Sequence, residues 1–264
     1  LKNCAIEPEI KDLTNFLSKA GAKIKWIGKR TLQIHGVKSL KSINYTVMGD
    51  RIEAGTFCVA ATLAQGNLKI NNLNPKIIAT EINLLKKTGA KIKTNKNEIL
   101  IKGPKKIQSI KSIKTKEFPG IPTDLQAQLM VLMCKAVGKS SITENIFENR
   151  FMHVAELQRL GAKIKIKNNT AEIEGKTKFI AAELMSSDLR ASVALVLAAI
   201  VFFYNLTKEL LKCIPNYLKE ELTTELLKEE AFSESGADIQ KFTRLLKETS
   251  DDLMKLQASP FINV

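Results

Sequence analysis

The sequence predicts an α/β protein built from a repeated unit of about 70 residues. The pentapeptide G-A-K-I-K occurs at Gly21, Gly89 and Gly161, with spacings of 68 and 72 residues. An amphipathic stretch precedes each copy, and apolar and polar residues alternate after it. The first pattern indicates a helix and the second indicates a pair of strands. Because one such unit cannot bury both of its apolar faces, several units must pack together.

Each element of the unit has a chemical reason. Glycine ends the helices, because it adopts the left-handed backbone conformation after a last helical turn without a Cβ clash. The second strand of each pair closes on I-x-G, at residues 34–36, 101–103 and 173–175. Upstream of two copies we expect a helix opened by an aspartate, at 50–66 and 124–138, and a short strand at 68–71 and 141–144. The unit is therefore helix, strand, helix, strand, strand.

The repeat is incomplete at both ends. Counted backward from Asp50, the first unit has no opening helix, whereas a third opening helix begins at Asp188 and loses the pattern at Phe202, Phe203 and Tyr204. Short helices are expected in the tail at 206–212, 218–231 and 239–256. The tail is either a genuine appended helical segment or a non-native ending, and the simultaneous change in pattern and charge balance favours the second.

Composition excludes several classes of protein. The 264-residue chain has a formal charge of +14 but only 6% aromatic residues, and its lysines stand singly beside isoleucines. Nucleic-acid binders usually cluster basic residues and interleave aromatic ones, so we expect no nucleic-acid partner. Its 4 cysteines form no C-x-x-C pair, which indicates reduced thiols, no bound metal and a cytoplasmic protein. With neither a bilayer-length apolar stretch nor a leader, we expect no membrane association.

Several longer motifs carry a resemblance to a known family. They are P-T-D-L-Q-A-Q at 122–128, T-E-N-I-F-E-N-R-F-M-H-V at 143–154, E-P-E-I at 7–10, D-R-I-E-A-G-T-F at 50–57 and S-D-L-R-A-S at 187–192. In this order, over residues 1–200, the sequence resembles the UDP-N-acetylglucosamine 1-carboxyvinyltransferases, a group of enolpyruvyltransferases.

The resemblance implies a fold and a division into domains. The family fold is an inside-out α/β barrel of enolpyruvyltransferase-like repeats, arranged as two domains of three units with the active site between them. Here the barrel is expected to be incomplete, with an unrelated helical C-terminal tail. Residues 1–47 correspond to the last unit of the first domain, 48–200 to an incomplete second domain, and 201–264 to the divergent tail.

The resemblance also implies a reaction. The enolpyruvyl group of phosphoenolpyruvate is transferred to the 3-hydroxyl of UDP-N-acetylglucosamine with release of phosphate, the first committed step of peptidoglycan synthesis. This chemistry needs a base, an acid and cations, but no cofactor. A separate chain could supply the missing units. The alternatives are a shikimate-pathway enolpyruvyltransferase and a non-catalytic basic binding module.

Asp124 is the candidate base, because Pro122 stiffens the entry to the helix that it opens. The alternative is a helix N-cap, since Asp50 and Asp188 occupy equivalent positions in the repeat. The resemblance assigns Asp124 both the base role and a substrate contact, and Thr123 is carried over with it as substrate-binding.

Further candidates follow from the same resemblance. Asp188 and Arg190 are expected to act near the atoms derived from phosphoenolpyruvate, the alternative for Arg190 being a surface salt bridge. Ile146 and Arg150 are expected to contact the nucleotide sugar, although Glu148 could simply pair with Arg150. The family's catalytic cysteine, its Lys-Asn pair and its late arginine have no counterpart here, so this chain alone is expected to be inactive.

Overall fold

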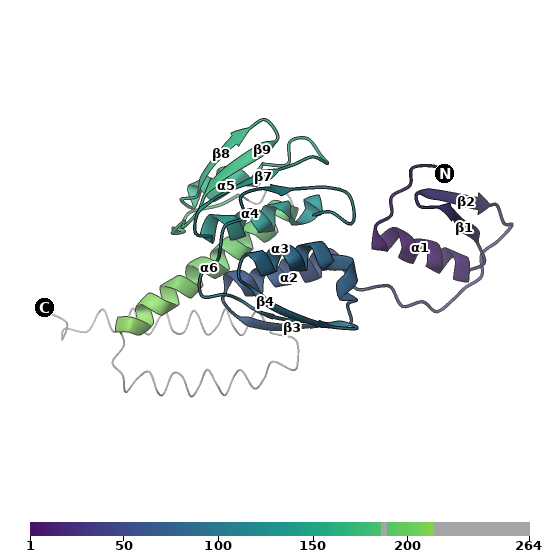
Figure 1. Ribbon diagram of the computed structural model, residues 1–264, viewed down its shortest axis with the longest axis horizontal. Helices are drawn as coiled ribbons and strands as arrows, with labels where there is room; N and C mark the ends of the chain where they lie inside the picture. Colours follow the sequence, from purple (N-terminus) through teal and green to yellow (C-terminus); the bar gives the residue numbers. More distant parts are fainter. Residues whose placement is uncertain (186–188, 214–264) are drawn as a thin grey trace, which may run out of the picture. The chain divides into compact units, whose positions relative to one another are not determined.

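The computed structural model describes residues 1–185 and 189–213, and within them the predicted repeat is confirmed (Figure 1). The first unit comprises α1 (Pro8–Lys19), β1 (Lys23–Gly28) and β2 (Thr31–His35). The second comprises α2 (Arg51–Leu63), β3 (Asn67–Asn71), the 3-10 turn η1 (Pro75–Ile78), α3 (Ala79–Lys87), β4 (Lys91–Asn95) and β5 (Glu98–Lys102).

The third unit repeats this order with two additions. It comprises β6 (Ile113–Lys114), the 3-10 turn η2 (Thr123–Leu125), α4 (Gln126–Lys135), β7 (Lys139–Thr143), α5 (His153–Arg159), β8 (Lys163–Lys167) and β9 (Thr170–Glu174). The last described element is α6 (Leu189–Cys213). Additional to the predicted unit are β6 and the two 3-10 turns η1 and η2, and η2 carries Asp124.

In the second and third units the helices α2, α4 and α6 lie inside and the sheets lie outside. The strand orders are β1-β2, β3-β5-β4 and β6-β7-β9-β8, and all neighbours are antiparallel except β6 and β7. In α4, nine consecutive residues from Gln126 to Cys134 are buried, and α2 packs in the same hydrophobic cluster. The lysines of the K-I-K strands are exposed, which suits the edge strands β4 and β8. This arrangement is an inside-out α/β fold.

The glycines behave as the repeat predicts. Gly21, Gly89 and Gly161 have φ angles of 105°, 101° and 91°, so each ends its helix in the left-handed region. Gly103 and Gly175 have another role, because a Cβ there would overlap the carbonyl oxygens of Ala61 in α2 and Ala136 after α4. The I-x-G motif thus lets the second strand meet the end of the opening helix.

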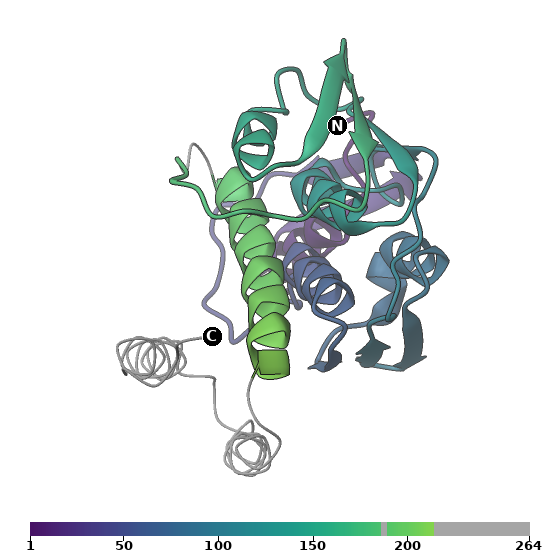
Figure 2. The ribbon, with the colours of Figure 1, turned by 90° about the vertical axis from the view of Figure 1, so that its left-hand side faces the viewer.

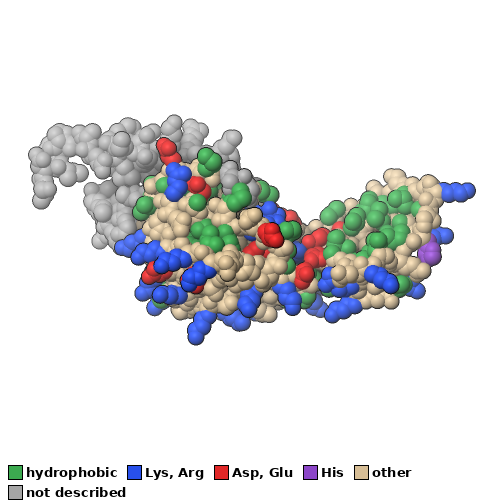
Figure 3. Space-filling view, turned by 90° about the horizontal axis from the view of Figure 1, so that it is seen from above, with side chains coloured by type: hydrophobic (Ala, Val, Ile, Leu, Met, Phe, Trp, Pro, Cys, Tyr) green, Lys and Arg blue, Asp and Glu red, His purple; other side chains and the backbone are tan. Residues whose placement is uncertain are grey.

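The first unit is the exception. At Gly36 a Cβ would meet nothing within 4 Å. On α1, Leu13 and Phe16 are 51% and 38% exposed, whereas α3 and α5 bury their corresponding apolar residues. In Figure 3 hydrophobic side chains gather on the right-hand part of the view, which residues 1–47 form. The apolar residues of α1 are thus less buried than their counterparts in the other two units.

One predicted helix is wrong. The loss of register at Phe202–Tyr204 does not interrupt α6, and the short helix expected at 206–212 is the last part of α6. The physical reason is that residues 189–213 contain neither glycine nor proline. Figure 2 shows α6 beside α2 and α4, with which its residues Ala194, Leu195, Leu197, Ala198 and Val201 share one hydrophobic cluster. The helices expected at 218–231 and 239–256 lie outside the described residues.

Candidate functional site

Asp124 lies on the 3-10 turn η2, immediately before α4. Pro122 precedes the turn in an extended conformation, and Leu125, 1% exposed, packs against α2 at Gly55. A Cβ at Gly55 would come 2.5 Å from Leu125 Cδ1, so the glycine makes room for the turn that carries Asp124. The packing of Leu125 therefore fixes the position of the turn that carries Asp124.

The helix N-cap alternative is wrong for Asp124 and right for Asp50. The Asp50 carboxylate accepts hydrogen bonds from the backbone N–H groups of Ile52 at 2.7 Å and Glu53 at 3.2 Å. Asp124 is the N-cap of neither η2 nor α4, whose N-caps are Pro122 and Leu125. The 3-10 turn displaces Asp124 from the capping position, and its carboxylate instead pairs with arginine side chains.

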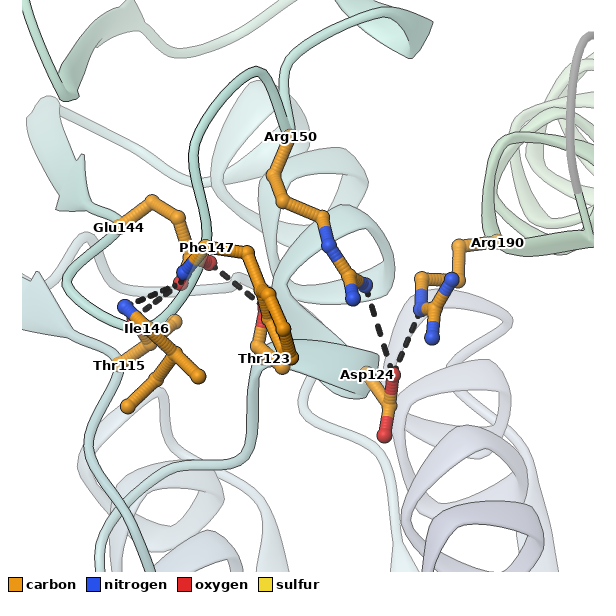
Figure 4. Close-up of polar contacts among 8 residues, drawn as sticks. All are labelled: Thr115, Thr123, Asp124, Glu144, Ile146, Phe147, Arg150 and Arg190. Atoms are coloured by element: carbon orange, nitrogen blue, oxygen red, sulfur yellow. Dashed lines mark hydrogen bonds and ion pairs between the residues drawn. The ribbon is translucent and has the colours of Figure 1, made fainter.

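Two arginines converge on the Asp124 carboxylate (Figure 4). Arg190, on α6, donates from Nε to Asp124 Oδ1 at 2.6 Å. Arg150 lies in the loop between β7 and α5, and a terminal nitrogen of its guanidinium is 3.6 Å from the same oxygen. The Asp124 and Arg190 side chains are 38% and 39% exposed. An accessible cluster of two cations and one anion suits an anionic ligand, since arginine binds such groups with its planar fork of donors.

The Arg150 guanidinium is held in place by contacts on two sides. Its central carbon lies 4.3 Å from the centre of the Phe147 ring, and its side chain is only 20% exposed. The predicted alternative, an ion pair with Glu148, is wrong, because the ion pair that Arg150 forms is with Asp124. Glu148 is exposed in the same loop.

A hollow of about 900 Å³ lies beside this loop. It is lined by residues 144–152 and by Ile166, Asn168 and Asn169, so Ile146 and Arg150 share one cavity wall. Thr123 is 8% exposed and donates its hydroxyl to the Glu144 carboxylate at 2.8 Å. The structure therefore brings Asp124, Arg150 and Arg190 into contact and places Ile146 nearby. It turns the Thr123 side chain inward, and Asp188 lies outside the described residues.

Sequence reasoning assigned no role to Glu144, Thr115 or Phe147. Glu144 is 3% exposed and accepts hydrogen bonds from the hydroxyls of Thr115 and Thr123. The one available sequence signal for Glu144 is its place in the T-E-N-I-F segment, at the end of the strand that precedes the Arg150 loop. In the described part of the chain, no group of three or more His, Cys, Asp and Glu side chains could hold a metal ion.

The same inside-out α/β fold occurs in enolpyruvyl transferases. An enolpyruvyl transferase from Streptomyces tendae, NikO, matches with a TM-score of 0.69 and 27% identity, over 76% of this chain and 48% of its own. An EPSP synthase from Acinetobacter baumannii shares the fold with a TM-score of 0.53, at 21% identity over 71% of this chain and 47% of its own. Both solved structures therefore have the fold class observed in this chain.

The family follows from the sequence. Residues 1–214 match the family model of EPSP synthase (3-phosphoshikimate 1-carboxyvinyltransferase), and the chain belongs to this family of enolpyruvyltransferases. A UDP-N-acetylglucosamine 1-carboxyvinyltransferase from Pelagibacter ubique is 66% identical over 200 residues, and one from Geotalea daltonii is 48% identical. These matches cover 76% of this chain and 48% of each relative, so the chain spans about half the length of the curated relatives it matches.

None of the helices in the described part of the chain combines the length and apolarity that a bilayer crossing requires.

Proposed function

We propose that this chain carries the hydroxyl-activating side of an enolpyruvyl transferase that acts on phosphoenolpyruvate and UDP-N-acetylglucosamine in peptidoglycan synthesis. The observation that carries the proposal is that Asp124, unlike Asp50, caps no helix and faces two arginines at an accessible surface. The curated relatives at 66% and 48% identity are UDP-N-acetylglucosamine 1-carboxyvinyltransferases, which favours this acceptor over shikimate 3-phosphate.

In the proposed reaction Asp124 accepts the proton of the sugar 3-hydroxyl as the oxygen attacks C2 of phosphoenolpyruvate. An ionised carboxylate is an acceptor, and a base must lie within hydrogen-bonding reach of the proton it takes. A proton is added to C3 to give a tetrahedral adduct, and loss of phosphate from C2 together with a proton from C3 then leaves the enolpyruvyl ether. The family's cysteine acid is not among this chain's matched motifs, so the 264-residue chain alone is expected to release no phosphate.

The arginines serve the charged parts of the substrates. We assign Arg150 and Ile146 to the nucleotide sugar and Arg190, with Asp188, to the atoms derived from phosphoenolpyruvate. Preorganised cations stabilise charge that develops in a transition state, because they need no reorganisation as the reaction proceeds. The contacts of Arg150 with Phe147 and Asp124 supply that preorganisation.

The division of the chain into domains is part of the proposal. Residues 1–47 form the last unit of a first domain, 48–200 belong to a second domain, and 201–264 form a divergent tail. The uncovered face of residues 1–47 and the open space at Gly36 support a further repeat unit above them, in the same chain or a separate one. Limited proteolysis tests the first boundary, and cleavage between residues 36 and 50, where no helix or strand is present, is the expected result.

A non-catalytic basic binding module is the alternative from another class. The lysines of the K-I-K strands stand singly between isoleucines rather than in clusters, which disfavours a polyanion surface. The described cysteines, Cys4, Cys58 and Cys134, are free thiols, which supports the cytoplasmic location that we propose.

Calorimetric titration separates the two functions. UDP-N-acetylglucosamine and a random oligonucleotide are each titrated into the 264-residue chain at low and moderate salt. The proposal predicts saturable sugar-nucleotide binding with little salt dependence. Oligonucleotide binding that falls steeply with salt, without sugar-nucleotide binding, would support the polyanion module instead. Phosphate release by the isolated chain from the two substrates would contradict the expected inactivity.

A further inference from the structure

Glu144 is a buried carboxylate whose hydrogen-bonding partners come from three separate segments. Its Oε1 accepts from the Thr115 hydroxyl at 2.9 Å and from the backbone N–H groups of Ile146 at 2.8 Å and Phe147 at 3.2 Å. Its Oε2 accepts from the Thr123 hydroxyl at 2.8 Å. Figure 4 shows the carboxylate between these groups. Such a set of donors offsets the cost of burying the charge.

These hydrogen bonds connect the two segments that carry the candidate site. Thr123 directly precedes Asp124 on η2, whereas Ile146 and Phe147 belong to the loop that carries Arg150. The ring of Phe147 in turn lies against the Arg150 guanidinium. The Glu144 carboxylate therefore binds both segments that meet where Arg150 lies 3.6 Å from Asp124, namely the η2 turn and the Arg150 loop.

Other contacts anchor Glu144 itself. Its backbone carbonyl accepts from the side-chain amide of Asn169 at 3.1 Å, and its backbone N–H donates to the carbonyl of Asn169 at 2.8 Å. The Thr115 hydroxyl also accepts from the backbone N–H of Asn145 at 2.8 Å. The carboxylate is thus fixed to the sheet end before it reaches across to Thr123.

We propose that Glu144 is a positioning residue, which sets the distance between Asp124 and Arg150 by binding the η2 turn and the Arg150 loop together. A carboxylate suits this role because all of its partners here are donors, and only an ionised carboxylate accepts at both oxygens without offering a hydrogen. The consequence for substrate binding rests on the proposed function, whereas the structural connection does not.

The first experiment measures the connection without any ligand. Amide hydrogen exchange is followed in the whole chain and in its Glu144→Ala, Glu144→Gln and Glu148→Gln variants. Glu148 is an exposed carboxylate of the same loop and serves as the matched control. In Glu144→Ala the amides of Ile146 and Phe147 should exchange about ten- to a hundredfold faster, since hydrogen bonds to a charged group are lost. The β9 amides and the Glu148→Gln variant should stay unchanged.

The glutamine variant keeps the proposal testable if the alanine variant unfolds. A glutamine amide oxygen can still accept at one position, and the Thr123 hydroxyl can rotate to accept from its NH₂ group. Glu144→Gln should therefore show a smaller acceleration than Glu144→Ala at the same two amides. Unchanged exchange at Ile146 and Phe147 in both variants, or equal acceleration throughout β7 and β9, would overturn the proposal.

The second experiment tests positioning through a double-mutant cycle. Affinity for UDP-N-acetylglucosamine is measured for Glu144→Gln, Arg150→Ala and the double variant. If Glu144 acts through Arg150, the double variant should bind about as weakly as Arg150→Ala alone, whereas independent losses that multiply would refute positioning. If the unchanged chain does not bind the sugar nucleotide, the proposed function fails, and hydrogen exchange still decides the role of Glu144.

Discussion

Replacing Glu81 with glutamine should remove a loss of stability that the protein suffers as the pH rises. Glu81 lies on α3 and is only 5% exposed. Burial raises the pKa of its carboxyl from 4.5 to about 7, against the opposing effects of its own backbone hydrogen bond and of Arg51. The native state therefore keeps a proton that the unfolded state has already released. Between about pH 4.5 and 7 the contribution of Glu81 to the free energy of unfolding therefore falls as the pH rises.

The pKa difference sets the size of the effect. One pKa unit corresponds to about 1.4 kcal/mol, so the full change is of order 3 kcal/mol. Glu81→Gln stays neutral at every pH, and should be about as stable as the unchanged chain near pH 4.5 and more stable by up to this amount at pH 8. The hydrogen bond from Arg51 lowers the pKa of Glu9. The contribution of Glu9 to the free energy of unfolding therefore rises with pH, and it does so at lower pH than the change due to Glu81.

The assay is urea unfolding of both proteins at several pH values between 5 and 8. The exposed carboxylate Glu117 provides the control, and Glu117→Gln should follow the unchanged chain throughout. An equal stability difference between Glu81→Gln and the unchanged chain at pH 5 and pH 8 would rule out ionisation of Glu81 as the cause, because a pH-independent difference reflects packing.

Two further predictions concern the repeat and the thiols. Gly103→Ala and Gly175→Ala should each lower the free energy of unfolding by about 1–3 kcal/mol or more in urea titrations, since a Cβ would overlap a helix-end carbonyl. Gly36→Ala, where nothing lies within 4 Å, should change it far less, and equal losses at all three sites would contradict this account. Burial raises the pKa of the Cys58 and Cys134 thiols to about 12, so peptide mapping should show slow disulfide-reagent labelling of both until urea unfolds the chain. Rapid labelling of either in the native protein would contradict their burial.

Local sequence signals accounted for most of the fold. The positions of Gly21, Gly89 and Gly161 were predictable because a left-handed residue after a helix is a local requirement that glycine meets. The continuation of α6 past Phe202 was not predictable, because a run of aromatic residues interrupts the repeat pattern without ending a helix. The 3-10 turn before α4 was also missed, since the repeat alone gives Asp124 the same place as Asp50.

The site depended more on tertiary packing. The motifs singled out Asp124, Arg150 and Arg190, but Arg190 and Asp124 lie 66 positions apart and meet only after α6 packs beside α4. No local pattern reports such a contact. Glu144 was missed because an acidic residue after a strand normally reads as a surface position, and its burial appears only when Thr115 and Thr123 close around it.

We propose that the Asp124 carboxylate contacts a ligand, whereas the carboxylate of its repeat counterpart Asp50 caps a helix. The most direct measurement determines both the UDP-N-acetylglucosamine affinity and the urea midpoint for Asp124→Ala and Asp50→Ala. Asp124→Ala should weaken binding about ten- to a hundredfold with little loss of stability. Asp50→Ala should cost about 1 kcal/mol of stability and leave the affinity unchanged. Unaltered affinity in Asp124→Ala, together with a stability loss like that of Asp50→Ala, would contradict a ligand-binding role for Asp124.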